Sequence, residues 1–574
     1  MQTNHFSLKV VAALLAVSAA IATLLPYMGA RISAGSEWRG ITPELSYDAM
    51  RYFASANDIT RGHIFAHNPY FFEHRDETIP NPTFNDAIVA LPQILGFSFN
   101  VGYYANIFFW ALAFFFLLYA FFRSHALSPA LGFFGALFVY AGLYGDMLRP
   151  GAMQIIYPLY IVFLLLFWRY VNRKDQSVIP LAMAAGLTAY FYIFLFMTVA
   201  ATLGIYFLAL CLSRNWAELR RILLMGIVAV AVALPHIAHV FFLASQDFYK
   251  ETLARGNLFY SHWPQIEAYY YGRWVVIALL LGYLLRRYYP ERVNSATHFF
   301  VAITGLGILL AMVSNIFTGQ DFGIATHIGR FGIIWYLMVG VIILAPVCEF
   351  LFRARGLWQK RAFIGLLSVL LAYQMVANLN RSTFRFGEMW GKSAEVQTYG
   401  GVLDWLKRQP EGVVFAPEDL NSYIPMLTKQ YLLYHPHGGM FLVNDDEFQE
   451  RFLLYYAFDQ LTLDEFVEST PLYGPAPSEL AKTSVLRHRL CTLVHKEEDC
   501  PTPLPLRSFL DVAAMQKKYT DYYPNLVANI ASEYAKYHVR YIVSVAGERH
   551  PLLGGPLCPM VYQDQWFEAC QISI

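Results

Sequence analysis

The chain has 574 residues and a formal net charge of +1, and 57% of its residues are hydrophobic while only 14% are charged. Soluble proteins have roughly 25% charged residues, so these values exclude a wholly soluble protein, and the near-neutral charge favours no nucleic acid. Long apolar runs fill the chain up to about residue 379 and then stop. The sequence therefore predicts a polytopic α-helical membrane protein, with a transmembrane domain at 1–380 and a soluble domain at 381–574.

Eleven membrane-spanning helices are expected in the first domain, because each run approaches the roughly 20 residues that cross a bilayer. We expect them at 7–28, 101–122, 129–145, 153–169, 179–193, 196–213, 222–243, 274–288, 298–317, 332–351 and 362–379. The tract 179–213 is too long for one span and short for two, so we expect a tight turn near Tyr192. A cleaved signal peptide is an alternative for the first span, although its Ala-rich core reaches Met28 without a clean cleavage site.

The short loops predict the orientation, because Lys and Arg accumulate on the cytoplasmic side of a membrane. Basic residues follow the second, fourth, sixth, eighth and tenth spans: Arg123; Arg169, Arg173 and Lys174; Arg214, Arg220 and Arg221; Arg286, Arg287 and Arg292; Arg353, Arg355, Lys360 and Arg361. The N-terminus is therefore expected in the cytoplasm. An odd number of spans then places the C-terminal domain outside.

The first outer loop is long, at about residues 29–100. Residues 47–60 are expected to form a helix, because their apolar residues fall on one face, and Gly62 is expected to end it. A helix that lies along the membrane surface would hold Asp48 close to the bilayer. A second short interfacial helix is expected from Asp86 to Gly96.

Further ionisable residues are expected at the outer membrane boundary. Asp146 and Arg149 lie between the third and fourth spans, and Asp321, His327 and Arg330 lie just before the tenth. Charges at this depth are costly and tend to face a cavity or one another. Snorkelling to the interface or local pairing is the alternative for any one of them.

The soluble domain has four of the six cysteines. An even number of cysteines in an exported domain suggests disulfides, and sequence proximity favours Cys491 with Cys500 and Cys558 with Cys570. Four free thiols are the alternative. No two of these cysteines have the two-residue spacing of a zinc knuckle.

The rest of this domain has mixed helix and strand signals, which predict an α/β or α+β domain. Helices are expected at 403–406 and 447–458, and strands at 413–415 and 541–545. His435-Pro436-His437 offers half of a metal site, but a loop without metal is the more common role of such a sequence.

One part of the first outer loop resembles a known family. The segment from Tyr47-Asp48-Ala49-Met50 through Gly62, followed by His67-Asn68-Pro69-Tyr70, is similar to the first outer loop of GT-C superfamily glycosyltransferases. There an acidic residue follows the first span, and a Tyr-rich helix, a Gly and a Pro-containing stretch come next. The layout of residues 1–380 resembles this family too. The chain lacks a Trp-Trp-Asp-Tyr-Gly motif and a clear Asp-Glu pair, so it is most similar to a general bacterial branch.

The resemblance implies an integral membrane glycosyltransferase of the bacterial inner (cytoplasmic) membrane, with its C-terminal domain periplasmic or extracellular. It would transfer a hexosyl or pentosyl group from a polyprenyl-phosphate-linked donor to a glycan, lipid or protein acceptor. No cofactor is assigned with certainty, no metal ligand is assigned, and a divalent metal ion is left open. The alternatives are a transporter or flippase for a lipid-linked or anionic substrate, which should show internal repeats, and a non-catalytic assembly or polymerase partner.

Asp48 matches the family's acidic residue, so the resemblance implies that it is the catalytic base. One carboxylate that takes the acceptor's proton during direct attack implies inversion at the anomeric carbon. A favourable charge near a helix N-terminus is the alternative for Asp48. Glu37, Asp58 and Asp76 are the other candidate bases.

The remaining site residues are expected at the same face. Arg330, Arg149 and His327 are expected to bind the donor phosphate, because a guanidinium offers a bidentate fork to phosphate oxygens. Pairing with Asp146, three residues away, is an equal alternative for Arg149. Acceptor or sugar binding is expected of Tyr47, Tyr52, Glu73, His74 and Asp76.

Overall fold

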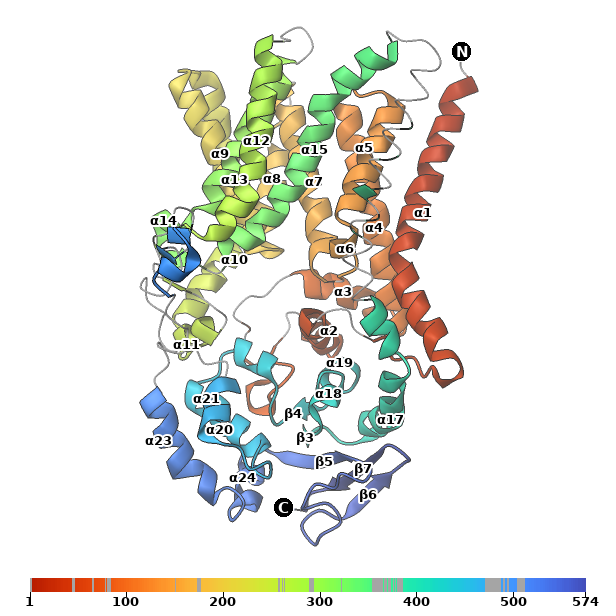
Figure 1. Cartoon of the computed structure of the whole chain (residues 1–574), viewed down its shortest axis with the longest axis vertical. Helices are drawn as coiled ribbons and strands as arrows, with labels where there is room; N and C mark the ends of the chain where they lie inside the picture. Colours follow the sequence, from red (N-terminus) through yellow and green to blue (C-terminus); the bar gives the residue numbers. More distant parts are fainter. Residues whose placement is uncertain are drawn as a thin grey trace.

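The structure is a computed structural model of the chain. It describes residues 3–43, 47–63, 67–77, 79, 84–149, 151–172, 177–255, 259–260, 262, 264–288, 294–321, 323–353, a few positions between 365 and 378, 386–469, 487–488, 491–492, 495–502 and 512–573. These residues form a bundle of long helices and a mixed α/β region at one end of it (Figure 1). The first residues of the chain lie at the opposite end of the bundle from the α/β region (Figure 1).

Among the described residues, eight helices are long and apolar enough to cross a membrane. They are α1 (Thr3–Ala34), α4 (Phe99–Ser124), α7 (Met153–Asn172), α9 (Ile193–Leu212), α10 (Trp216–Ala244), α12 (Ile266–Tyr288), α13 (Ser295–Met312) and α15 (Ile324–Arg353). Two shorter apolar helices, α5 (Pro129–Gly142) and α8 (Ile179–Leu187), join them. These ten helices coincide with the first ten predicted spans and confirm a polytopic membrane protein. The eleventh, at 362–379, falls largely outside the described residues.

The predicted turn inside the tract 179–213 is confirmed. A 3-10 turn at Thr188–Tyr190 follows α8, and α9 begins at Ile193. Close helix packing in this part of the bundle depends on small residues. A Cβ added to Gly307 of α13 would lie 2.6 Å from the Cα atom of Thr202 in α9, so a larger side chain would force the two helices apart.

The first outer loop forms the two predicted helices, α2 (Tyr47–Thr60) and α3 (Phe84–Ile94). Gly62 follows α2 with φ +107°, a conformation that suits glycine and that turns the chain back after the helix. Helix α2 lies between the bundle and the α/β region (Figure 1). On the bundle side, the Phe53 ring stacks on Tyr103 of α4 with 4.8 Å between ring centroids.

The C-terminal region is built on a five-stranded mixed sheet in the order β4-β3-β5-β7-β6. The strands are β3 (Val413–Phe415), β4 (Tyr431–Leu432), β5 (Val539–Val545), β6 (Met560–Gln563) and β7 (Phe567–Gln571). The pairs β3–β4 and β3–β5 are parallel, whereas β5–β7 and β6–β7 are antiparallel. Disulfides join Cys491 to Cys500 and Cys558 to Cys570, which are the pairs that sequence proximity favours.

The predicted elements of this region are confirmed in type. Residues 403–406 lie in helix α17 (Gly400–Arg408), and residues 413–415 and 541–545 lie in β3 and β5. The helix predicted at 447–458 is α20 (Asp445–Tyr455), which begins two residues earlier because the Asn444 side chain caps it by accepting a 2.5 Å hydrogen bond from the Glu447 N–H. A mixed sheet with helices makes this an α/β region.

Candidate functional site

The first outer loop is bound to the C-terminal region by backbone carbonyls near β4. The amide of Asn57, on the last turn of α2, donates to the carbonyls of Pro425 at 2.8 Å and Thr428 at 2.7 Å. Further along the loop, the N–H of Leu432 in β4 donates to the carbonyl of Tyr70 at 2.7 Å. The Tyr70 carbonyl therefore extends the hydrogen bonding at the edge of the sheet. A movement of α2 away from the C-terminal region would break the two hydrogen bonds of Asn57.

A charge network makes a second connection between these two parts. The Arg451 guanidinium of α20 is fully buried, and it pairs with Glu73 of the loop and, at 2.8 Å, with Glu447 on its own helix. His74 lies 3.0 Å from Glu447 and 2.9 Å from Glu77. Two acidic side chains of the loop and one of α20 thus share Arg451 and His74.

The network changes the protonation of its members. Burial by itself lowers the pKa of His74, but the carboxylates of Glu447 and Glu77 outweigh it and raise the pKa to about 9. Burial raises the pKa of Glu447, but His74 and Arg451 outweigh it and lower the pKa to about 2. At neutral pH His74 is therefore positively charged and Glu447 negatively charged.

A later outer segment binds to the same region. Arg255 ends α11 (Tyr249–Arg255), and its Nε donates to the Gly439 carbonyl at 2.8 Å while a terminal nitrogen pairs with Asp445. The carboxylate of Glu251 accepts the backbone N–H of Asp445 at 2.7 Å. Two outer segments far apart in the sequence therefore hold the C-terminal region against the bundle.

Polar residues from several elements meet at the end of the bundle that faces α2. We name this group the outer cluster, and it consists of Arg51, Tyr52, Asp86, Asp146, Arg149, Tyr157, Tyr192, His327 and Arg330. Two hydrogen bonds order part of it: Tyr157 donates to the Asp146 carboxylate at 2.7 Å, and the hydroxyl of Tyr192 lies 2.6 Å from Nδ1 of His327. Ionisable groups gathered at the end of apolar helices are typical of a functional site.

Electrostatic interactions connect the remaining members of the outer cluster. Arg330 of α15 lies within electrostatic range of Asp146, Tyr157 and Tyr192. Tyr192 also lies within electrostatic range of Arg149 and of Arg51 of α2.

Arg51 ties the cluster to the first outer loop. It interacts with Asp86 of α3, and its guanidinium lies 5.0 Å from the centre of the Tyr52 ring. Three arginines and two carboxylates, supplied by α2, α3, α6 (Tyr144–Met147) with the residues after it, and α15, therefore share one site.

The structure brings the three predicted phosphate ligands together, because Arg330, Arg149 and His327 all belong to the outer cluster. Tyr52, predicted to bind sugar, lies in the same cluster. Tyr47 and Asp48 are the first two residues of α2, and their side chains lie outside the described residues.

The other predicted acceptor ligands lie within residues 67–77, the part of the first outer loop that contacts the C-terminal region. Glu73 and His74 contact Arg451 and Glu447, as described above. Asp76 is largely exposed, with its carboxylate 3.6 Å from Arg75. Asp58, an alternative base in the sequence, has a side chain that is only 1% exposed.

Five members of the outer cluster were not predicted as ligands from the sequence: Arg51, Asp86, Asp146, Tyr157 and Tyr192. Of these, Asp146 was predicted only as a charge at the membrane boundary. Arg51 and Asp86 lie on the two helices that the sequence predicts at the outer surface, so an inspection of their ionisable residues would have found both. Tyr157 lies inside an apolar span, where no sequence signal separates it from a packing residue. Tyr192 marks the turn between two spans, and its polar role depends on His327, which lies in a distant helix.

The histidine pair of the C-terminal region has protein partners in the structure. Nδ1 of His435 accepts the backbone N–H of His437 at 3.1 Å, and Nε2 lies 3.3 Å from the hydroxyl of Ser422. Nδ1 of His437 lies 3.4 Å from the hydroxyl of Tyr70, and burial lowers the pKa of His437 to about 3. These contacts connect the pair to the first outer loop through Tyr70.

Solved structures of known proteins are among the matches to the chain. No family model matches the chain, and no curated protein matches it. The chain is similar to the crystal structure of ArnT from Cupriavidus metallidurans bound to undecaprenyl phosphate, with 14% sequence identity, a TM-score of 0.42 and 97% of each chain covered. It is also similar to the apo oligosaccharyltransferase of Archaeoglobus fulgidus, with 11% identity, a TM-score of 0.33, and coverage of 95% of this chain and 70% of that one. The function is therefore inferred from this chain's own residues.

Proposed function

We propose that this chain is a GT-C-type glycosyltransferase that transfers a sugar from a polyprenyl-phosphate donor to an acceptor at the outer face of the membrane. The observation that supports this proposal is the outer cluster. It lies at the ends of membrane-spanning helices, where the phosphate of a lipid carrier would lie, and under a helix that the C-terminal region holds in place.

The charges of the outer cluster suit a phosphodiester. Among the described members of the outer cluster, Arg51, Arg149 and Arg330 outnumber the carboxylates of Asp86 and Asp146 by one, and this count does not include the proposed base Asp48. A sugar joined to a prenyl chain through one phosphate carries one negative charge. Guanidinium groups bind phosphate oxygens through paired, charge-assisted hydrogen bonds, and this supports Arg330 and Arg149 as phosphate ligands. The hydrogen-bonded pair of Tyr192 and His327 lies beside them.

In the proposed reaction Asp48 acts as the base. The acceptor oxygen attacks the anomeric carbon while its proton passes to the Asp48 carboxylate, and the bond from that carbon to the phosphate oxygen breaks. The prenyl phosphate leaves with the bonding electrons, and the configuration inverts. Asp48 precedes Arg51 by three residues, about one helical turn of α2, so the proposed base and a cluster arginine belong to the same short helix.

The acceptor would approach beside the first outer loop. Exposed Asp76 and the ring of Tyr52 are proposed to contact the acceptor or the sugar. The contacts of Glu73 and His74 with α20 support a docking role for these two residues. The basic loops and the two disulfides support a cytoplasmic N-terminus and an exported C-terminal region.

The proposal is tested by donor binding and turnover in lipid nanodiscs. Replacing Arg330 with Lys keeps the positive charge but removes the paired N–H donors of the guanidinium. We therefore expect the affinity for a polyprenyl phosphate to fall at least about tenfold, which corresponds to the loss of one charge-assisted hydrogen bond. The matched control is Arg287→Lys, an exposed arginine at the end of α12, which should bind like the unmodified protein. Full affinity in Arg330→Lys would contradict the bidentate contact.

Turnover separates the transferase from the flippase. A transferase releases free polyprenyl phosphate and forms a glycosylated acceptor, whereas a flippase leaves the donor chemically intact and changes only its leaflet. Intact donor after incubation with an acceptor pool from the native envelope, together with movement between leaflets, would overturn the proposed reaction.

A further inference from the structure

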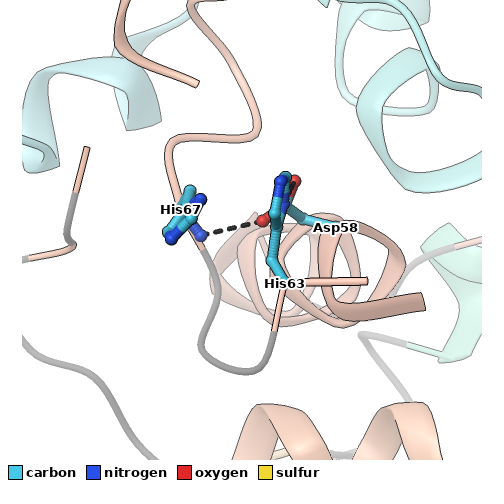
Figure 2. A group of neighbouring side chains, drawn as sticks. All are labelled: Asp58, His63 and His67. Atoms are coloured by element: carbon cyan, nitrogen blue, oxygen red, sulfur yellow. Dashed lines mark hydrogen bonds and ion pairs between the residues drawn. The ribbon is translucent and has the colours of Figure 1, made fainter. Parts of the chain in front are cut away.

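Three side chains with metal-binding atoms meet where α2 ends (Figure 2). His63 and His67 both lie beside Asp58, which is on the last turn of α2 (Figure 2). Nδ1 of His63 lies 2.9 Å from Oδ1 of Asp58, and the backbone N–H of His67 donates to Oδ2 at 2.8 Å. One oxygen of Asp58 and one ring nitrogen of each histidine all lie within 4.8 Å of one another.

The burial of this group favours a cation. Asp58 is 1% exposed and already accepts the backbone N–H of His67, and a positive charge beside it would further stabilise a carboxylate that is so deeply buried. In the part of the chain that the structure describes, Nδ1 of His67 is buried and has no hydrogen-bond partner. The centroids of the two imidazole rings lie 4.3 Å apart, so both histidines lie beside the Asp58 carboxylate.

The ligand set selects the metal. Zn²⁺ binds imidazole nitrogen and carboxylate oxygen at about 2.0–2.2 Å in a tetrahedron, which places neighbouring ligand atoms about 3.3–3.6 Å apart. The separations here, from 2.9 Å to at most 4.8 Å, bracket that value. Ca²⁺ and Mg²⁺ prefer sites made of oxygen atoms, and two histidines do not suit them.

We propose that Asp58, His63 and His67 bind a Zn²⁺ ion, with water as the fourth ligand, and that this ion holds the two histidines against the end of α2. Described residues before and after this group bind the same segment of the C-terminal region. Asn57 donates to the carbonyls of Pro425 and Thr428 before it, and the carbonyl of Tyr70 accepts the N–H of Leu432 after it. The ion therefore stabilises the conformation in which the first outer loop binds next to β4.

This inference does not depend on the proposed glycosyltransferase activity, so its test needs no substrate. Full-length protein, stripped with a chelator and returned to metal-free nanodiscs, is titrated with Zn²⁺ while bound metal and thermal unfolding are measured. We expect one Zn²⁺ per chain and a saturable rise in unfolding temperature, because a ligand that binds only the folded state stabilises it. Titration with Co²⁺ alone should give the visible absorption of a tetrahedral nitrogen and oxygen site.

Variants assign the ion to these residues. Asp58→Asn and His67→Gln keep side-chain size and hydrogen bonding but remove a metal ligand. Each should lower Zn²⁺ affinity at least about 100-fold, because the loss of a residue that only hydrogen-bonds to a ligand already costs up to about 100-fold. His495→Gln, at an exposed histidine of the C-terminal region, is the matched control and should bind normally.

Two results would overturn the proposal. Absence of Zn²⁺ and of the Co²⁺ spectrum in the unmodified protein would show a metal-free hydrogen-bonded group. Equal affinity in His67→Gln and in the unmodified protein would place any bound ion elsewhere. Because the first result comes from the unmodified chain, the test holds even if a variant fails to fold.

Discussion

His74 offers a direct measurement of how firmly the first outer loop is held. Its ring lies 3.0 Å from Glu447 of α20 and 2.9 Å from Glu77, and its side chain is only 12% exposed. The two carboxylates raise its pKa from 6.5 to about 9 against the effect of burial. At 1.36 kcal/mol per pKa unit, the charged form of His74 is therefore favoured in the folded protein by about 3 kcal/mol, and the part of this that comes from Glu447 stabilises the docked loop.

The sign of the pH dependence follows from the raised pKa. A histidine whose pKa is higher in the docked state contributes its full stabilisation below about pH 6.5, and this is lost as the pH rises through about 9. At about pH 8, roughly 1.4 kcal/mol remains. We expect docking to weaken steadily on the alkaline side of neutrality, whereas His74→Gln, which carries no charge, should show no such loss.

Amide hydrogen exchange of peptides from residues 67–77 measures this difference. Comparing the unmodified protein with His74→Gln at each pH cancels the intrinsic dependence of exchange on pH. We expect up to about 100-fold greater protection in the unmodified protein at about pH 6, falling to nearly equal protection at about pH 10. His495→Gln serves as the control for loss of an exposed histidine. Parallel profiles for His74→Gln and the unmodified protein across this range would refute the reasoning.

Three other predictions test the fold and the proposed reaction. Asp48→Asn should fold and bind donor normally but lose at least about 100-fold in turnover, the low end for a general base, and near-normal turnover would transfer the role to Asp76. Gly438→Ala should destabilise docking by about 1–3 kcal/mol in thermal unfolding, because its Cβ would lie 2.3 Å from the Phe71 ring, whereas Gly391→Ala, with open space around it, should not. A C-terminal reporter that fluoresces only in the cytoplasm should stay dark, and a bright signal would reverse the orientation.

The sequence predicts well those features that depend on neighbouring residues. The length of apolar runs gives ten of the helices, and the apolar face of residues 47–60 followed by Gly62 gives α2 with its end. Short apolar stretches such as 413–415 and 541–545 give two strands, because their β-branched residues favour extended structure. Each of these predictions depends on residues that are close in the sequence, within a few helical turns or along one strand.

The outer cluster could be predicted only in part, because its members come from six separate segments of the chain. Arg330 and Arg149 stand out as charges beside apolar runs, but nothing near Arg51 in the sequence shows that it lies close to Tyr192. In the same way, Glu73 has no local signal for its pairing with Arg451, which depends on how α20 packs. Tertiary packing decides these contacts, and a single sequence does not encode it in any short pattern.

The pairing of Glu73 with Arg451 also has a consequence for biosynthesis. The two residues are 378 positions apart, so at about 5–20 residues per second the ribosome makes Arg451 roughly 20–80 seconds after Glu73. During that interval the acidic side chains of the first outer loop lack the guanidinium that neutralises them in the finished protein. The first outer loop therefore reaches its final contacts only after α20 has been made. Before that point it would be most accessible to a quality-control protease.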